Sequence, residues 1–207
     1  MQLRSDNFQH GKPIPPEFAF GKAGQPMALS DNRNPHLAWK GAPAGTRSFV
    51  LACIDTDVPS KPDDVNKEGR TVPADLPRVE FAHWLMANIP AECGELADGS
   101  CSDDITPRGK QQPFGPPGSV QGVNDYTGWF AGDPAMGGTY LGYDGPCPPW
   151  NDSIVHHYHF HVYALDAERL ALKPGFTLSD LRAAMAGHVL AEAVLTGTYS
   201  LNPKVPA

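Results

Sequence analysis

Alternating polar and apolar positions mark one long strand in the second half of the chain, the segment HHYHFHVYALD at 156–166. Side chains of a strand point to opposite faces with a period of two. His156, Tyr158 and the apolar residues at every second position after them therefore share one face. We expect this face to look into a core, with His156 and Tyr158 at its rim. The opposite face carries a histidine row, defined here as His157, His159 and His161.

The histidine row has two interpretations. Imidazole is a common ligand of zinc and nickel, so three rings at every second position could reach one metal ion. Alternatively, the row is a polar face that looks at water or at a neighbouring loop. Local spacing places no cysteine or carboxylate on that face. We therefore predict a polar row that binds no metal.

Two more strands are predicted upstream, SFVLACID at 48–55 and FAHWLMANIP at 81–90. In the second of these, a period of two places His83 on the same face as Leu85 and Ala87. The polar excursion between the two strands is too long for a hairpin turn. Residues 91–155 show no strong periodicity but carry scattered aromatic residues, which can anchor a loop on a core. We expect this long segment to be ordered.

Helical spacing appears only near the end of the chain. Thr177 is followed three positions later by Asp180, the arrangement of a helix cap. Leu178, Leu181, Met185 and Val189 then follow helical spacing. This pattern predicts one amphipathic helix of about four turns that tolerates Gly187. The residues GTYSL after it are predicted to form a short terminal strand or an extended segment.

Composition supports an all-β or loop-rich architecture, because 21 glycines and 22 prolines among 207 residues favour turns over long helices. The length suits a single domain over residues 1–207. Four cysteines show no zinc-ribbon spacing. Of these, Cys53 is expected to be a core thiol, whereas Cys93 and Cys101 could pair only in an oxidising compartment.

The formal net charge of −7 argues against general nucleic-acid binding and against attraction to anionic membranes. The longest apolar run, FVLACI at 49–54, is too short to span a bilayer, and the first residues contain no apolar segment. We expect a soluble, cytoplasmic protein without stable membrane insertion.

Three clusters could carry chemistry. Asp55 and Asp57 lie two positions apart where a buried strand runs out, although aspartates at strand ends often bond to turn amides instead. His83 opens an apolar strand and could equally be an imidazole at the edge of the core. The segment GYDGPCPPWND at 142–152 is a turn whose backbone amides could point at an anion.

Taken together, DTDVP, HWLMANIP, GYDGPCPP and HHYHFHVYALD resemble the phosphatidylethanolamine-binding protein family, in particular its bacterial Raf kinase inhibitor-like branch. The resemblance implies a β-sandwich of antiparallel strands with an α-helix near the C-terminus and long Pro/Gly-rich loops. It also implies a small pocket that takes phosphate, phosphorylated head groups, acetate or similar anions. The pocket motif of the family falls here on Asp55, Asp57, His83, Pro146, Pro148, Pro149, His156 and Tyr158.

Two departures from the family pattern stand out. His157 occupies the position where relatives carry an arginine, so a titratable ring replaces a permanent charge. The excursions at about 60–80 and 98–141 are longer than in compact relatives. They would wall the pocket, cover it, or form an interface.

These observations favour a protein that binds a small anionic ligand and needs no cofactor or metal. His83, His156 and the turn amides would donate to the anion, and Tyr158 would add a hydroxyl. Asp55 and Asp57 would orient the imidazoles and hold protons on them. The alternative is a hydrolase-like enzyme with a His/Asp acid–base pair, although the chain has no G-x-S-x-G motif. Modulation of a partner enzyme through the long loops, and a homodimer, also stay open.

Overall fold

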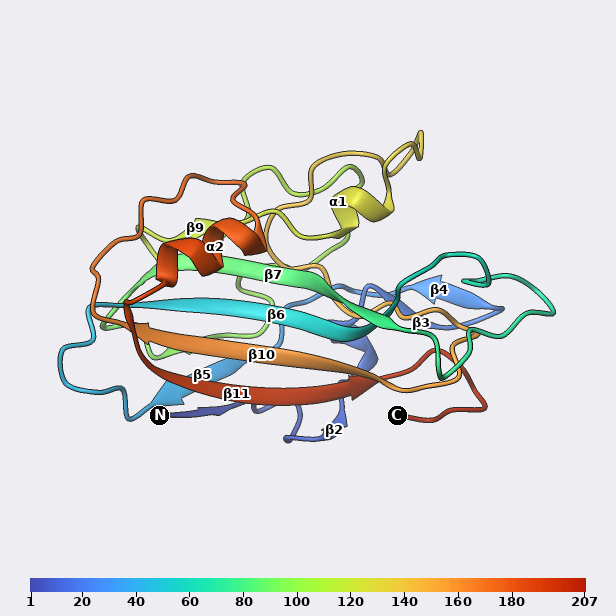
Figure 1. Ribbon diagram of the computed structural model, residues 1–207, viewed down its shortest axis with the longest axis horizontal. Helices are drawn as coiled ribbons and strands as arrows, with labels where there is room; N and C mark the ends of the chain where they lie inside the picture. Colours follow the sequence, from blue (N-terminus) through green and yellow to red (C-terminus); the bar gives the residue numbers. More distant parts are fainter.

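The computed structural model describes residues 1–207 and is built mainly from β-strands (Figure 1). A large sheet has the strand order β2-β11-β10-β6-β7-β9, and its neighbours are antiparallel except for β2, which runs parallel to β11. Its strands are β2 (Lys12–Pro13), β6 (Ser48–Pro59), β7 (Arg78–Pro90), β9 (Val120–Gln121), β10 (His156–Leu165) and β11 (Val189–Tyr199).

A smaller sheet, of order β1-β5-β8, lies across one face of the large sheet. Its strands are β1 (Gln2–Arg4), β5 (Leu37–Lys40) and β8 (Glu95–Leu96). The main hydrophobic core fills the space between the two sheets. Leu37, Trp39 and Leu96 of the small sheet meet Trp84, Phe160 and other residues of the large sheet there. The expected all-β sandwich is therefore confirmed.

The remaining elements are short. A hairpin joins β3 (Gly21–Ala23) to β4 (Met27–Leu29), and the helical turns are η1 (Pro16–Phe18) and α1 (Tyr126–Trp129). Figure 1 places the β3–β4 hairpin, α1 and the excursion between β6 and β7 toward the same end of the sandwich. No helix is long and apolar enough to cross a membrane.

The predicted C-terminal helix exists but is shorter than expected. The helix α2 (Leu178–Met185) begins with the Thr177–Asp180 capping box and buries Leu181 and Met185 against a second hydrophobic cluster on the outer face of the sheet. It ends after eight residues, and Gly187 then adopts a φ of +83°. The prediction of about four turns with Val189 in the helix is wrong. Pairing with β10 along nearly its whole length draws Val189 into a strand of 11 residues, not a short terminal one.

The strand that carries His83 is irregular at that residue. Cys53 pairs with Trp84 and Ile54 pairs with Ala82, so His83 is an extra residue in β7. Such a β-bulge re-aims a side chain. Leu85 and Ala87 pack into the outer cluster as their spacing predicts, but His83 faces the ring of Tyr158 on the inner side, with ring centroids 5.1 Å apart. The predicted shared face of His83, Leu85 and Ala87 is therefore wrong.

Candidate ligand-binding cavity

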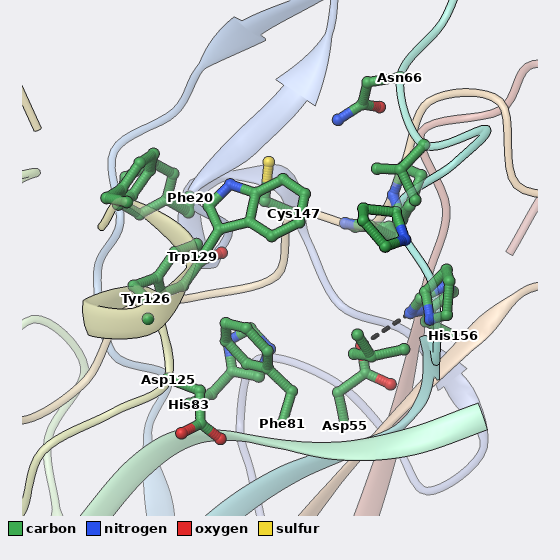
Figure 2. Close-up of a pocket in the computed structure, with 18 of the residues that line it drawn as sticks. Phe20, Asp55, Asn66, Phe81, His83, Asp125, Tyr126, Trp129, Cys147 and His156 are labelled. Atoms are coloured by element: carbon green, nitrogen blue, oxygen red, sulfur yellow. Dashed lines mark hydrogen bonds and ion pairs between the residues drawn. The ribbon is translucent and has the colours of Figure 1, made fainter. Parts of the chain in front are cut away.

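One cavity of about 660 Å³ collects most of the side chains that the family motif points to (Figure 2). Asp55 comes from β6, His83 from β7, and His156 and Tyr158 from β10. All four are at least 97% buried. Pro148 and Pro149 of the turn before β10 also line the cavity. The size and the mostly apolar lining match a site for a small molecule.

Asp57 and Pro146 do not line this cavity. The carboxylate of Asp57 accepts hydrogen bonds from the backbone N–H and the Nδ1 of His157, both at 2.8 Å, on the side of the histidine row. The carbonyl of Pro146 accepts the backbone N–H groups of Phe20 and Gly21. Both residues therefore shape the surroundings of the cavity and present no side chain to it, contrary to the sequence-based assignment.

The imidazole of His156 is held between two carboxylates. Its Nδ1 lies 2.7 Å from Asp55 Oδ2 and its Nε2 lies 3.0 Å from Asp152 Oδ2. A ring that donates from both nitrogens carries a positive charge. Burial alone would lower its pKa, but the hydrogen bonds and charges of Asp152 and Asp55 raise the pKa of His156 to about 9. Because both N–H groups are used, His156 cannot donate to a ligand as the sequence suggested.

Asp152 in turn pairs with Arg78 through two hydrogen bonds, of 2.6 and 3.0 Å. Burial would raise the pKa of Asp152, but the hydrogen bonds from His156 and Arg78 lower it overall. A continuous network of alternating charges therefore runs Arg78–Asp152–His156–Asp55. Sequence analysis named neither Arg78 nor Asp152. The available signal was an aspartate four positions before His156.

Arg78 also attaches the excursion 60–77 to the cavity. Its guanidinium donates to the carbonyls of Pro73 and Leu76 within that excursion. The side-chain amide of Asn151, next to Asp152, donates to the carbonyls of Asp64, Lys67 and Arg70. Three residues so held, Pro62, Val65 and Asn66, line the cavity. The excursion is therefore an ordered wall of the site.

His83 is arranged differently from His156. Its Nδ1 lies 2.7 Å from the backbone carbonyl of Asp144, and a carbonyl can only accept, so Nδ1 carries the hydrogen. Burial lowers the pKa of His83, and this outweighs the raising effects of Asp55 and of the Asp144 carbonyl. Its Nε2 has no hydrogen-bond partner in the protein and is not among the completely buried atoms. Because His83 lines the cavity, this nitrogen opens onto it. The expectation that both aspartates hold a proton on this ring is not met.

Asp144 anchors the second excursion in a similar way. Its buried carboxylate accepts hydrogen bonds from the side chains of Asn32, Lys110 and Asn124. The segment that contains Lys110 and Asn124 also contains α1, whose Tyr126 and Trp129 line the cavity. Asp144 and Asp152 thus stand at the two ends of one turn. Each joins a pocket imidazole to one of the two excursions.

Two donors at the cavity remain without a partner. The hydroxyl of Tyr158 is completely buried and has no partner of good hydrogen-bond geometry in the protein, although the carboxylate of Asp55 is near enough to add to the effect of burial in raising the pKa of Tyr158. Within the turn 144–150, the N–H of Cys147 also has no acceptor, whereas the other amides are bonded inside the protein or belong to proline. The turn therefore has one amide without a partner in the protein, fewer than the sequence suggested.

The upper walls of the cavity are aromatic. Figure 2 shows Trp129 and Phe20 across from His156, with Phe81 beside His83. Besides Tyr158, the aromatic lining residues are Phe20, Phe81, Tyr126, Trp129 and Phe130. No lysine or arginine lines the cavity. The only charge that His156 could offer an anion is already balanced by its two carboxylates.

The histidine row lies outside the cavity, and each ring has its own partner. His157 bonds to Asp57, and His161 bonds to Glu192 at 2.6 Å. His159 lies between the hydroxyls of Thr56 and Thr196. The rings of His157 and His159 stack with centroids 6.4 Å apart, and the ring of His161 is tilted against that of His159 at 6.2 Å. This arrangement agrees with a polar row.

Comparison with known proteins identifies the family of this chain. The family model described as "Phosphatidylethanolamine-binding protein" matches residues 4–200. The chain belongs to the phosphatidylethanolamine-binding protein family. A UPF0098 protein of Methanothermobacter thermautotrophicus is 38% identical over 169 residues, covering 82% of this chain and 83% of the relative. UPF0098 protein YbhB of Escherichia coli is 30% identical over 97% of this chain and all of the relative.

Solved structures of the phosphatidylethanolamine-binding protein family agree with the fold. Escherichia coli YbcL, described as a member of the mammalian family, superposes with a TM-score of 0.68 at 27% identity, covering 96% of this chain and 97% of YbcL. A putative homologue from Chlamydia trachomatis gives 0.65 at 29% identity and covers 96% of each chain. Membership of this family supports a ligand-binding role for the chain.

Proposed function

We propose that the cavity binds a small oxyanion, either free or as the head group of a larger molecule: phosphate, a phosphorylated head group or a carboxylate. The observation that carries the proposal is a pair of polar side-chain groups without partners in the protein, the Nε2 of His83 and the hydroxyl of Tyr158. The side of the cavity that these two groups form is called its floor. Buried polar groups are nearly always hydrogen-bonded, so the hydroxyl of Tyr158 calls for a partner. The Nε2 of His83 is unbonded in the protein and opens onto the cavity, where a ligand can reach it. The Cys147 N–H adds a third group. The aromatic walls would hold the remainder of the ligand.

Calorimetry with phenyl phosphate at pH 6 tests this proposal, with benzyl alcohol as the uncharged control. Phenyl phosphate should bind and benzyl alcohol should not. Tyr158→Phe removes the hydroxyl and keeps the ring, and should weaken phenyl phosphate about tenfold, the loss typical of one hydrogen bond to a charged group. Equal binding of both compounds, or no binding of phenyl phosphate, would refute the proposal.

A hydrolase-like enzyme is the second candidate, because histidines and carboxylates share one cavity. The geometry gives it less support. Both nitrogens of His156 are engaged, so this ring cannot exchange a proton with a substrate without breaking its ion pairs. Burial raises the pKa of the Cys147 thiol to about 12, so the one cysteine at the cavity is not a thiolate nucleophile at neutral pH. Turnover of phenyl phosphate that disappears in both His156→Ala and Asp55→Asn would favour the enzyme.

A further inference from the structure

The floor of the cavity offers an acceptor where an anion-binding site would be expected to offer a donor. Because Nδ1 of His83 must donate to the Asp144 carbonyl, the neutral ring leaves Nε2 with a lone pair and no hydrogen. This lone pair opens onto the cavity. A ligand oxygen that bears no hydrogen cannot form a hydrogen bond to this nitrogen, because both atoms are acceptors and their lone pairs repel.

The groups packed around His83 leave it neutral. Asp55 faces the ring from β6, but its carboxylate is already shared between His156 and the Asp57 N–H. Asp144 contributes its carbonyl, and its own carboxylate is bonded to Lys110. From the segment before α1, Asp125 bonds to the Ala82 N–H. Tyr126 and Tyr158 approach with ring edges, at centroid distances of 5.5 and 5.1 Å. Burial lowers the pKa of His83 despite these carboxylates.

The network of Arg78, Asp152, His156 and Asp55 cannot supply the N–H donor that His83 lacks at Nε2. His156 presents no free N–H, and the charges of Arg78, Asp152, His156 and Asp55 alternate in sign. The carboxylate of Glu80, which also lines the cavity, is paired with Arg182. A doubly charged ligand would therefore enter a site with no uncompensated positive charge, which costs free energy.

We infer that the cavity selects oxyacids in a form that still carries one hydrogen, with that P–OH or C–OH donating to Nε2 of His83 and another oxygen accepting from Tyr158. This inference rests on the proposed function and narrows it to a ligand class. Phosphate monoesters keep such a hydrogen near neutral pH, because their second ionisation lies near pH 6. Sulfate esters have the same single charge and a similar shape but no hydrogen to donate.

The test compares phenyl phosphate with phenyl sulfate by calorimetry at pH 6, where about half of the phosphate ester carries a single charge. Phenyl phosphate should bind at least about tenfold more tightly, the expected loss when a buried acceptor stays unpaired. At pH 8, titrations in buffers of different ionisation enthalpy should show uptake of about one proton on binding of the phosphate ester.

Variants separate the two groups at the floor. His83→Gln supplies an amide N–H, so the preference for phosphate over sulfate should largely disappear. Tyr158→Phe should weaken both ligands and leave the preference unchanged. Equal affinities of the wild-type protein for the two esters at pH 6, or no proton uptake at pH 8, would overturn the inference while leaving oxyanion binding intact. Binding of neither ester would instead refute the proposed function. Thermal unfolding checks that each variant is folded.

Discussion

The buried imidazolium of His156 should make the folded state less stable as the pH rises above neutrality. An unfolded histidine has a pKa of about 6.5, whereas Asp55 and Asp152 raise the pKa of His156 to about 9 in the folded protein. The folded state therefore binds this proton more tightly than the unfolded state. The resulting stabilisation is fully present below about pH 6.5 and is lost as the pH rises through about 9.

The size of the effect follows from the difference between the two pKa values. A rise of about 2.5 units at 1.36 kcal/mol per unit corresponds to about 3 kcal/mol of stabilisation at most. The side chain of His156 is 1% exposed, so solvent screens it little. Between pH 6.5 and 8.5, about 2 kcal/mol of this contribution should disappear. If each carboxylate supplies half of the rise, Asp55→Asn should lose only about 1 kcal/mol over the same interval.

Urea unfolding of the wild-type protein and of Asp55→Asn in reducing buffer at pH 6.5, 7.5 and 8.5 measures this difference. Ionisable groups remote from Asp55 contribute equally in both proteins and cancel in the comparison. The gap in unfolding free energy between the two proteins should narrow by about 1 kcal/mol as the pH rises. Imidazole nitrogen chemical shifts give the midpoint of His156 directly. A gap that stays constant, or a His156 midpoint near its ordinary value, would show that the ion-pair network does not hold the proton.

Three further outcomes are expected. Arg78→Met leaves Asp152 as a buried carboxylate without its arginine and should cost about 3–5 kcal/mol in urea unfolding, with faster hydrogen exchange in the excursion 60–77. Arg182→Met, which breaks an exposed bidentate pair, is the matched control and should cost about 1 kcal/mol or less. Leu181→Ala removes a fully buried side chain under α2 and should cost about 2–5 kcal/mol; a loss below 1 kcal/mol would contradict the packing. Untagged protein should contain no stoichiometric zinc or nickel by elemental analysis; one metal ion per chain would show that the histidine row is a metal site.

The parts of the fold that depend on local pattern could be predicted from the sequence. The strands of β6, β7 and β10 follow from continuous or alternating apolar runs, and the start of α2 follows from the Thr177–Asp180 cap. The end of α2 could not be predicted in the same way. Val189 continues the helical spacing beyond Gly187, but pairing with β10 over most of β11 outweighs it.

In the candidate site, the motif residues could be predicted from the sequence but their roles could not. Asp55, His83, His156 and Tyr158 were identified through the family motif, yet their roles depend on contacts between distant segments. The bulge that turns His83 inward arises from the pairing of β7 with β6, and a period of two cannot reveal it. Asp152 was missed because its importance comes from Arg78, 74 positions away in the chain. The hydrogen-bond partners of these residues, and the protonation states that depend on them, are set by the tertiary structure.

The turn between Asp144 and Asp152 also determines when the cavity can form during folding. Its two aspartates connect the imidazoles to excursions that begin and end far away in the chain, so the floor and the walls are completed by the same few long-range contacts. Contacts of this kind require the closure of large loops. Pairing of β10 with β6 joins Tyr158 to Asp55 and closes a loop at least as large, so the central strands and the site should form together. A nascent molecule would therefore have no site until β10 has reached β6.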